Sequence, residues 1–316
     1  MSLLDTFLRA PAPDVAVELS AHRIVAASLD ARAGQTTLTA HAIEPLPAGA
    51  LVPALTGANI VDRSAVQAAL GRALERVSKP RRVGLVLPDA VGRVSVVRFE
   101  KVPARAQELE QLVRWQVRKT APFPIEEAQV SFVPGASAAD GHEFLVTLAR
   151  RDVVQEYEGL CSTAGAHAGL VDLSSMCVAD AVRSSAAPLG DWMLLAIAPD
   201  AATVVIGRGV HPIFFRSRAA EGDDLLGELV HQTAMFYEDR LNGRGFSQVW
   251  LTGTAGDAVD IGALRKAVQE RLQHPVSAID LGRSVTFGSG ASSADALAPV
   301  LGLLLRDRST AKAGVA

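Results

Sequence analysis

Aromatic residues and cysteines are both scarce in this chain of 316 residues. Phe, Trp and Tyr together make up 5% of it, and there are two cysteines. A core must therefore be built mainly from Ala, Val and Leu, which is typical of sheets that are covered by helices. The cysteines, Cys161 and Cys177, form no disulfide or metal-ligand spacing, so we expect buried, reduced thiols in a cytoplasmic protein.

An excess of one charge and long apolar runs are also missing. The net charge is −3 at pH 7, which gives no reason to expect nucleic acid as a partner. No segment approaches the roughly 18 apolar residues of a membrane-spanning helix, and Leu297 to Leu305 is interrupted by Pro299. The N-terminus lacks a signal-peptide pattern. Residues 1–13 are expected to form an arm that packs on its own domain or contacts a membrane surface or partner.

The two halves of the sequence share one order of predicted elements. Each half opens with three short alternating segments that predict an antiparallel meander, at 15–43 and at 192–217, and helices then alternate with strands. This repetition predicts a duplicated α/β fold. The expected units are a first domain at 14–90 plus 168–187, an inserted α/β subdomain at 91–167, a second domain at 188–308 and a polar tail at 309–316.

Capping residues predict where several helices begin. Ser64 would begin a helix that ends near Val77, and Asp152 would begin another that ends near Gly165. Between the two strands that precede Asp152, a polar loop is expected around residues 135–141.

The segment from Ala104 to Val133 is distinctive in its order of patterns. A helical stripe of Leu, Val and Gln residues comes first, and Pro122 and Pro124 then force the backbone into an extended conformation around Phe123. A strand at 129–133 follows. A helix, a rigid bend and a strand are more typical of a protein-binding surface than of a reaction centre.

This segment also carries a family resemblance. Leu109 to Gln116 and Pro122 to Glu127 resemble the PilM family, cytoplasmic assembly proteins of type IV pili within the actin-like superfamily that includes the cell-division protein FtsA. The similarity continues at residues 210–217, 228–239 and 250–255. It therefore covers the chain from residue 14 to about residue 306. The resemblance implies an actin-like fold: duplicated β-meander/α domains with a small inserted α/β subdomain.

The resemblance also implies a function and a partner. PilM-like proteins bind the cytoplasmic N-terminal tail of PilN, a bitopic inner-membrane protein, as an extended peptide between the first domain and the inserted subdomain. The chain would then be a scaffold at the inner membrane, with pilus motor or platform components as further partners. The residues that we expect in or beside this groove are Val96, Arg98, Phe99, Trp115 and Phe123.

Actin-like proteins hold ATP and Mg²⁺ between two hairpin turns, each usually with an Asp and a Gly. Here the first turn has Glu18 and Ser20, and the second has Ala196 and Ala198 followed by Pro199. We therefore expect a vestigial site with no catalytic residue, no metal and no ATP hydrolysis, because phosphoryl transfer depends on precise positioning. The candidate nucleotide contacts are Glu18, Ser20, His22, Arg23, Gly253 and Thr254.

Three alternatives stay open at this point. Weak ATP binding without turnover would use the donors of His22 and Arg23, whereas an exposed polar turn needs no ligand at all. An actin-like ATPase or kinase would require a carboxylate at position 196. A cytoplasmic component of type II secretion, of the GspL type, would normally continue into a transmembrane helix, which this chain lacks.

Overall fold

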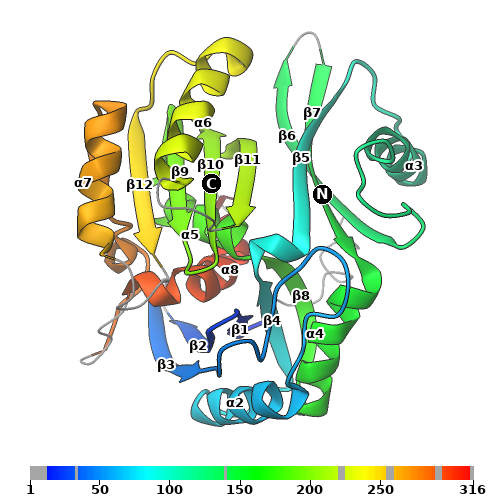
Figure 1. Cartoon of the computed structure of the whole chain (residues 1–316), viewed down its shortest axis with the longest axis vertical. Coiled ribbons are helices and arrows are strands. Elements are labelled where there is room, and N and C mark those ends of the chain that lie inside the picture. The colour runs from blue at the N-terminus through cyan, green and yellow to red at the C-terminus, as the bar shows by residue number, and fades with distance from the viewer. Residues whose placement is uncertain are drawn as a thin grey trace.

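The computed structural model describes residues 13–32, 35–138, 141–219, 225–253, 260–288 and 294–313 (Figure 1). Except for Pro13, the predicted N-terminal arm lies outside the described residues, and so does Thr254. Within the described part of the chain, no helix is long and apolar enough to cross a membrane.

The first sheet contains both antiparallel and parallel strands. Its strands, in order across the sheet, are β3 (Gln35–Pro45), β2 (Arg23–Arg32), β1 (Val15–Leu19), β4 (Arg82–Leu87) and β8 (His167–Leu173). The first three pair antiparallel, and the last two pair parallel with their neighbours. Every residue of β1 is buried, because its side chains alternate between two helical layers. This is the predicted opening meander, continued by buried parallel strands.

The second sheet repeats this topology. Its strands, in order, are β11 (His211–Ala219), β10 (Ala201–Arg208), β9 (Asp191–Ile197), β12 (Gln248–Gly253) and β13 (Val276–Ser277). The meander is again antiparallel, and the pairs that follow are again parallel. The duplication that the sequence predicts is therefore present in the fold.

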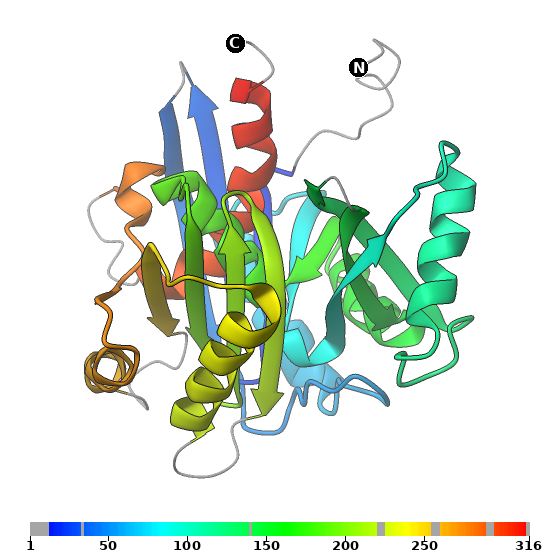
Figure 2. The same ribbon diagram turned by 90° about the horizontal axis from the view of Figure 1, so that it is seen from above.

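Helices cover both faces of the two large sheets. The outer layers are α2 (Arg63–Arg76) and α4 (Arg151–Thr163) on the first sheet, and α6 (Leu225–Leu241) and α7 (Ile261–Leu272) on the second. Between the sheets lie α5 (Ser174–Ala186) and α8 (Ala294–Ala313), which share one core with both (Figure 2). The backbone of α8 continues to Ala313, into the segment that was predicted to be a polar tail.

The third sheet is small and stands to one side of the molecule (Figures 1 and 2). Its strands, in order, are β5 (Gly92–Phe99), β7 (Gly141–Arg150) and β6 (Ala128–Ala138). The amphipathic helix α3 (Ala106–Val117) covers one face and buries Val113 and Val117 there. A short 3-10 helix, η1 (Asp89–Val91), joins β4 to β5, so the small sheet begins directly beside the first sheet.

Three sequence predictions about element ends are wrong. The cap of α2 is Asp62, not Ser64, because the Asp62 carboxylate accepts from the Ala65 amide at 2.9 Å. In α4, Arg150 occupies the cap position without a side-chain capping hydrogen bond, and Asp152 lies in the first turn, where its charge suits the helix dipole. The predicted loop at 135–141 is mostly strand, because β6 and β7 pair as a hairpin to Ala138 and from Gly141.

Both cysteines are buried and free, as predicted. Burial in the core under β4 raises the pKa of the Cys161 thiol to about 12. Cys177 lies between α5 and α8, where burial likewise raises its pKa. Neither thiol has the lowered pKa that a cysteine nucleophile needs.

Candidate functional site

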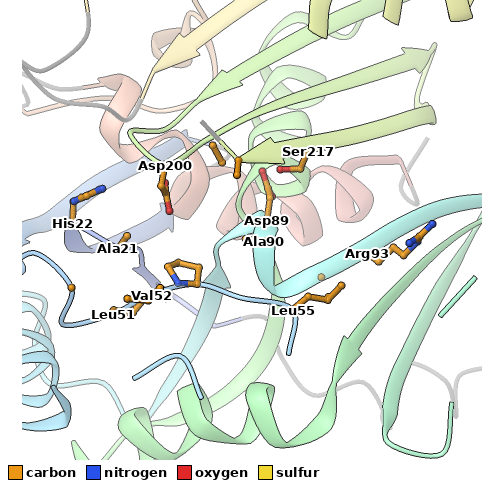
Figure 3. Close-up of a pocket in the computed structure, with 15 residues that line it drawn as sticks. Ala21, His22, Leu51, Val52, Leu55, Asp89, Ala90, Arg93, Asp200 and Ser217 are labelled. Carbon is orange, nitrogen blue, oxygen red and sulfur yellow. The ribbon is translucent and has the colours of Figure 1, made fainter. Parts of the chain in front are cut away.

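The first hairpin turns of the two meanders face each other across a cavity of about 470 Å³ (Figure 3). The β1–β2 turn brings Ala21 and His22 to it, and the β9–β10 turn brings Asp200. On the other side, the loop between β3 and α2 presents apolar side chains, and η1 and the start of β5 form the far end. The other residues that line this larger cavity are Gly49, Leu51, Val52, Pro53, Leu55, Asp89, Ala90, Gly92, Arg93, Ala201, Ser217 and Ala219.

A smaller cavity of about 50 Å³ lies between the same two turns. Asp89 and Asp200 line both cavities. Ala196 and Ala198 of the second turn line the smaller one together with Glu18 and Ser20. The two turns that the sequence singled out are thus brought together.

Glu18 extends from β1 into this closed space and is 3% exposed. Its Oε1 accepts a hydrogen bond from the Ser174 hydroxyl at 2.8 Å, whereas its Oε2 has no partner among the described residues. Burial raises the pKa of this carboxyl above its usual value, and the nearby charge of Arg23 opposes that rise only in part. Burial in turn lowers the pKa of Arg23, and Glu18 counteracts this.

Asp89 is the residue of both cavities that sequence reasoning missed. Its Oδ1 accepts from the Ser175 amide at 3.0 Å, and its Oδ2 accepts from the Ser175 hydroxyl and from the Thr203 hydroxyl, the latter at 2.7 Å. One carboxylate thereby joins the N-terminus of α5 to β10 in the second sheet. Burial raises the pKa of Asp89, and these hydrogen bonds oppose that rise. The signal for it was a carboxylate two residues after the end of the buried strand β4.

Ser20 and His22 do not converge on a common ligand position. The Ser20 amide and hydroxyl both donate to the Arg23 carbonyl, at 3.0 and 2.8 Å, so they close the turn on itself. The exposed His22 lines only the larger cavity. In the described part of the chain, no group of three or more His, Cys, Asp and Glu residues could hold a metal ion. Glu18, Asp89 and Asp200 place three carboxyl groups in the lining of the smaller cavity.

Gly253 lies at the end of β12, beside the start of α7. A Cβ at this position would lie 2.0 Å from the Ile261 Cδ1, the end of a flexible side chain. Thr254, the other residue predicted on this side, lies outside the described residues.

The five residues predicted for the partner groove are divided between the two faces of the small sheet, helix α3 and the proline bend. Val96 is half-buried against the core of the first sheet, whereas Phe99 packs on the α3 side, with its ring 5.9 Å from that of Phe144. Successive side chains of a strand point to opposite faces, so Arg98 shares the face of Val96. Trp115 is 64% exposed on α3, and Phe123 is half-buried in the proline bend. Among the described residues that line the larger cavity, the inserted segment contributes Gly92 and Arg93 instead.

Two similar sheets, a shared helical layer and a cavity between the paired hairpin turns define the actin-like fold. A protein-family model described as type IV pilus assembly protein PilM matches residues 16–241. The chain therefore belongs to the PilM family.

One solved structure shares this fold, and two others show weaker similarity. A structure described as a PilM–PilN type IV pilus biogenesis complex matches with a TM-score of 0.80 and 19% identity, covering 94% of this chain and 99% of that one. A Bacteroides thetaiotaomicron protein with an actin-like ATPase fold matches at 0.49 and 10% identity, over 91% and 95% of the two chains. The cytoplasmic domain of EpsL, from the type II secretion system of Vibrio cholerae, matches with a TM-score of 0.49 and 10% identity. This match covers 94% of this chain and 90% of that one.

Proposed function

We propose that this PilM-family chain is a non-catalytic scaffold of the type IV pilus inner-membrane assembly complex. In this role it binds the cytoplasmic N-terminal tail of a PilN-like bitopic protein, whose membrane anchor holds it at the inner membrane. Membership of the family supports the pilus assignment, and the match to a PilM–PilN complex supports the partner. Contacts with motor or platform components remain a prediction.

The larger cavity is the proposed binding site for the tail. The observation that carries this assignment is its position between the loop at 49–55 and the start of β5, where the first domain meets the inserted segment. Val52, 49% exposed, and the half-buried Leu55 offer apolar contacts to side chains of an extended peptide. Arg93 and Asp200 stand at its polar margins (Figure 3).

Isothermal titration calorimetry with a synthetic tail peptide of the partner tests this site. We expect a Val52→Glu, Leu55→Glu double variant to lose at least tenfold in affinity, because two charges would have to be buried under the peptide. Val61→Glu is the matched control, since Val61 is 68% exposed and does not line the cavity. Unchanged binding by the double variant, with a folded protein, would place the tail elsewhere.

We also propose that the nucleotide site is vestigial and that the chain has no ATPase activity. Three observations support this proposal. Positions 196 and 198 are alanines, and the three carboxyl groups of the smaller cavity belong to no metal-binding group among the described residues. The Ser175 amide already donates its hydrogen bond to Asp89. A triphosphate would meet negative charge where it needs N–H donors.

Calorimetry with Mg·ATP decides between this proposal and an ATP-binding actin-like protein. We expect no binding tighter than about 10 μM, which corresponds to roughly −7 kcal/mol. Tighter binding, or phosphate release above that of a heat-treated sample, would contradict the proposal.

A further inference from the structure

The apolar wall of the larger cavity is an irregular loop between β3 and α2. It contributes Leu51, Val52, Pro53 and Leu55 to the lining. Its two sides pair through an isolated antiparallel β-bridge between Leu51 and Ile60. A loop of this kind keeps one conformation only if its backbone polar groups find partners. The geometry of the wall therefore depends on whatever braces the loop.

Asn59 supplies this brace from inside the loop. It is 0% exposed, and its Oδ1 accepts from the Ala54 amide at 2.9 Å. Its Nδ2 donates to the carbonyls of Ala54 and Gly57, both at 3.1 Å. The side chain thus closes the turn at 54–57, which contains the cavity-lining Leu55. Asn59 itself does not line the cavity.

Helix α4 holds Asn59 in turn. The Tyr157 hydroxyl donates to Asn59 Oδ1 at 3.0 Å, and the Glu156 carboxylate accepts from the amides of Asn59 and Ile60 at 2.8 and 3.4 Å. Because α4 begins at the residue after β7 ends, the wall is fixed relative to the small sheet that forms the far end of the cavity. The two sides of the cavity are set by one hydrogen-bonded cluster.

We infer that Asn59, held by Tyr157 and Glu156, is the positioning residue that gives the tail-binding site its apolar wall. The inference rests on the proposed function. Its consequence is that apolar side chains of the partner peptide meet Val52 and Leu55 in a preformed arrangement, so the loop pays little ordering entropy on binding. Without the cluster the same side chains would be present but not held in place.

The decisive experiment compares Asn59→Ala with Asp62→Ala. Asp62 caps α2 at the end of the same loop, so its loss destabilises the helix without touching the brace. Tail affinity is measured by calorimetry, and hydrogen exchange is measured at the amides of Val52 and Ala54. We expect Asn59→Ala to weaken the tail at least tenfold and to speed exchange at both amides, while Asp62→Ala stays within twofold in affinity.

Each other outcome has a defined meaning. Unchanged affinity of folded Asn59→Ala, or an equal loss in Asp62→Ala, would overturn the inference. If Asn59→Ala does not fold, Tyr157→Phe and Glu156→Ala, which remove one and two bonds of the cluster, should each weaken the tail, the second more strongly; normal affinity in both would overturn it. A wild-type chain that binds no tail refutes the proposed function itself, and the exchange rates then decide whether Asn59 positions the loop.

Discussion

At the scale of single residues, the environment of Glu18 decides what the turn between β1 and β2 can do. The carboxyl is buried, and one of its oxygens lacks a partner among the described residues. Burial is the largest cause of its raised pKa, and the carboxylates of Asp89 and Asp200 add to it. A group in this state is a poor ligand for magnesium and repels phosphate when it is ionised.

The raised pKa predicts a pH dependence that Glu18→Gln should remove. Because the folded pKa lies above the unfolded one, Glu18 favours the folded state at pH values below the unfolded pKa, and this contribution is lost as pH rises through the folded pKa. The free energy of unfolding of Glu18→Gln, relative to wild type, should therefore increase from pH 4 to pH 8, by about 1.4 kcal/mol for each unit of the shift.

Urea unfolding at several pH values measures this difference. Glu75→Gln is a suitable control, since Glu75 is exposed and pairs with Lys79 at the surface. A difference between wild type and Glu18→Gln that stays constant with pH would show that Glu18 does not titrate as its burial implies.

At the scale of elements, the crossing of α5 and α8 holds the two large sheets together. A Cβ at Gly302 would lie 1.8 Å from the Cys177 carbonyl oxygen and 3.1 Å from the Ala181 amide nitrogen. Both are backbone atoms of α5, so no side-chain rotation can make room. The absence of a side chain at this position allows the helices to approach so closely that both sheets share one core.

Gly302→Ala should therefore destabilise the protein by about 3 kcal/mol, at the upper end of the cost of overpacking. Gly71→Ala is the matched control, because Gly71 lies inside α2 and a Cβ there would meet nothing within 4 Å. It should stabilise by about 0.5 to 1 kcal/mol through its higher helix propensity. Thermal and urea unfolding of both variants check the pair. Equal stability of Gly302→Ala and wild type would mean that the helices can separate without cost.

At the scale of the whole molecule, one arginine ties the central helices to the first sheet. Arg306 on α8 forms ion pairs with Asp172 at the end of β8 and with Asp180 on α5, and Arg183 adds a second pair to Asp180. Asp180 is buried, which raises its pKa, while Arg306 and Arg183 oppose that rise. The charges of three elements are thus balanced where the two halves meet.

Removing Arg306 should lower the free energy of unfolding by more than its ion pairs contribute to it. We expect Arg306→Met to lose about 3 to 5 kcal/mol of stability, since Asp172 would stay behind without its ion-pair partner and Asp180 would keep only its pair with Arg183. Adding Asp172→Asn and Asp180→Asn should recover much of the loss, because the amides carry no charge to bury. Urea unfolding of the single and triple variants measures this coupling, and additive losses would contradict it.

Local patterns in the sequence were enough to predict the duplicated meanders, the helix at 106–117 and the strands around them. Hydrophobic period and turn residues act within a few positions, so they can be read without the fold. The family resemblance added the actin-like class and the residues of the two turns, which the structure places around one cavity. Element ends were less predictable, because Asp62 and Ser64 are both good caps and only the backbone geometry chooses between them.

Only the tertiary structure decided which side chains meet. In the sequence, Asp89 is only a residue that follows a strand, and the structure shows that Thr203 of β10 bonds to it. Asn59 is likewise only a loop residue in the sequence, and the structure shows that Tyr157 and Glu156 of α4 bond to it. Val96 and Phe99 are three positions apart, yet they serve different cores, because a strand alternates its faces and the neighbouring layers determine what each face contacts. The sequence alone determined the elements and the family of this protein. The packing of distant segments decided its site, since hydrogen bonds and burial depend on separations that no local pattern records.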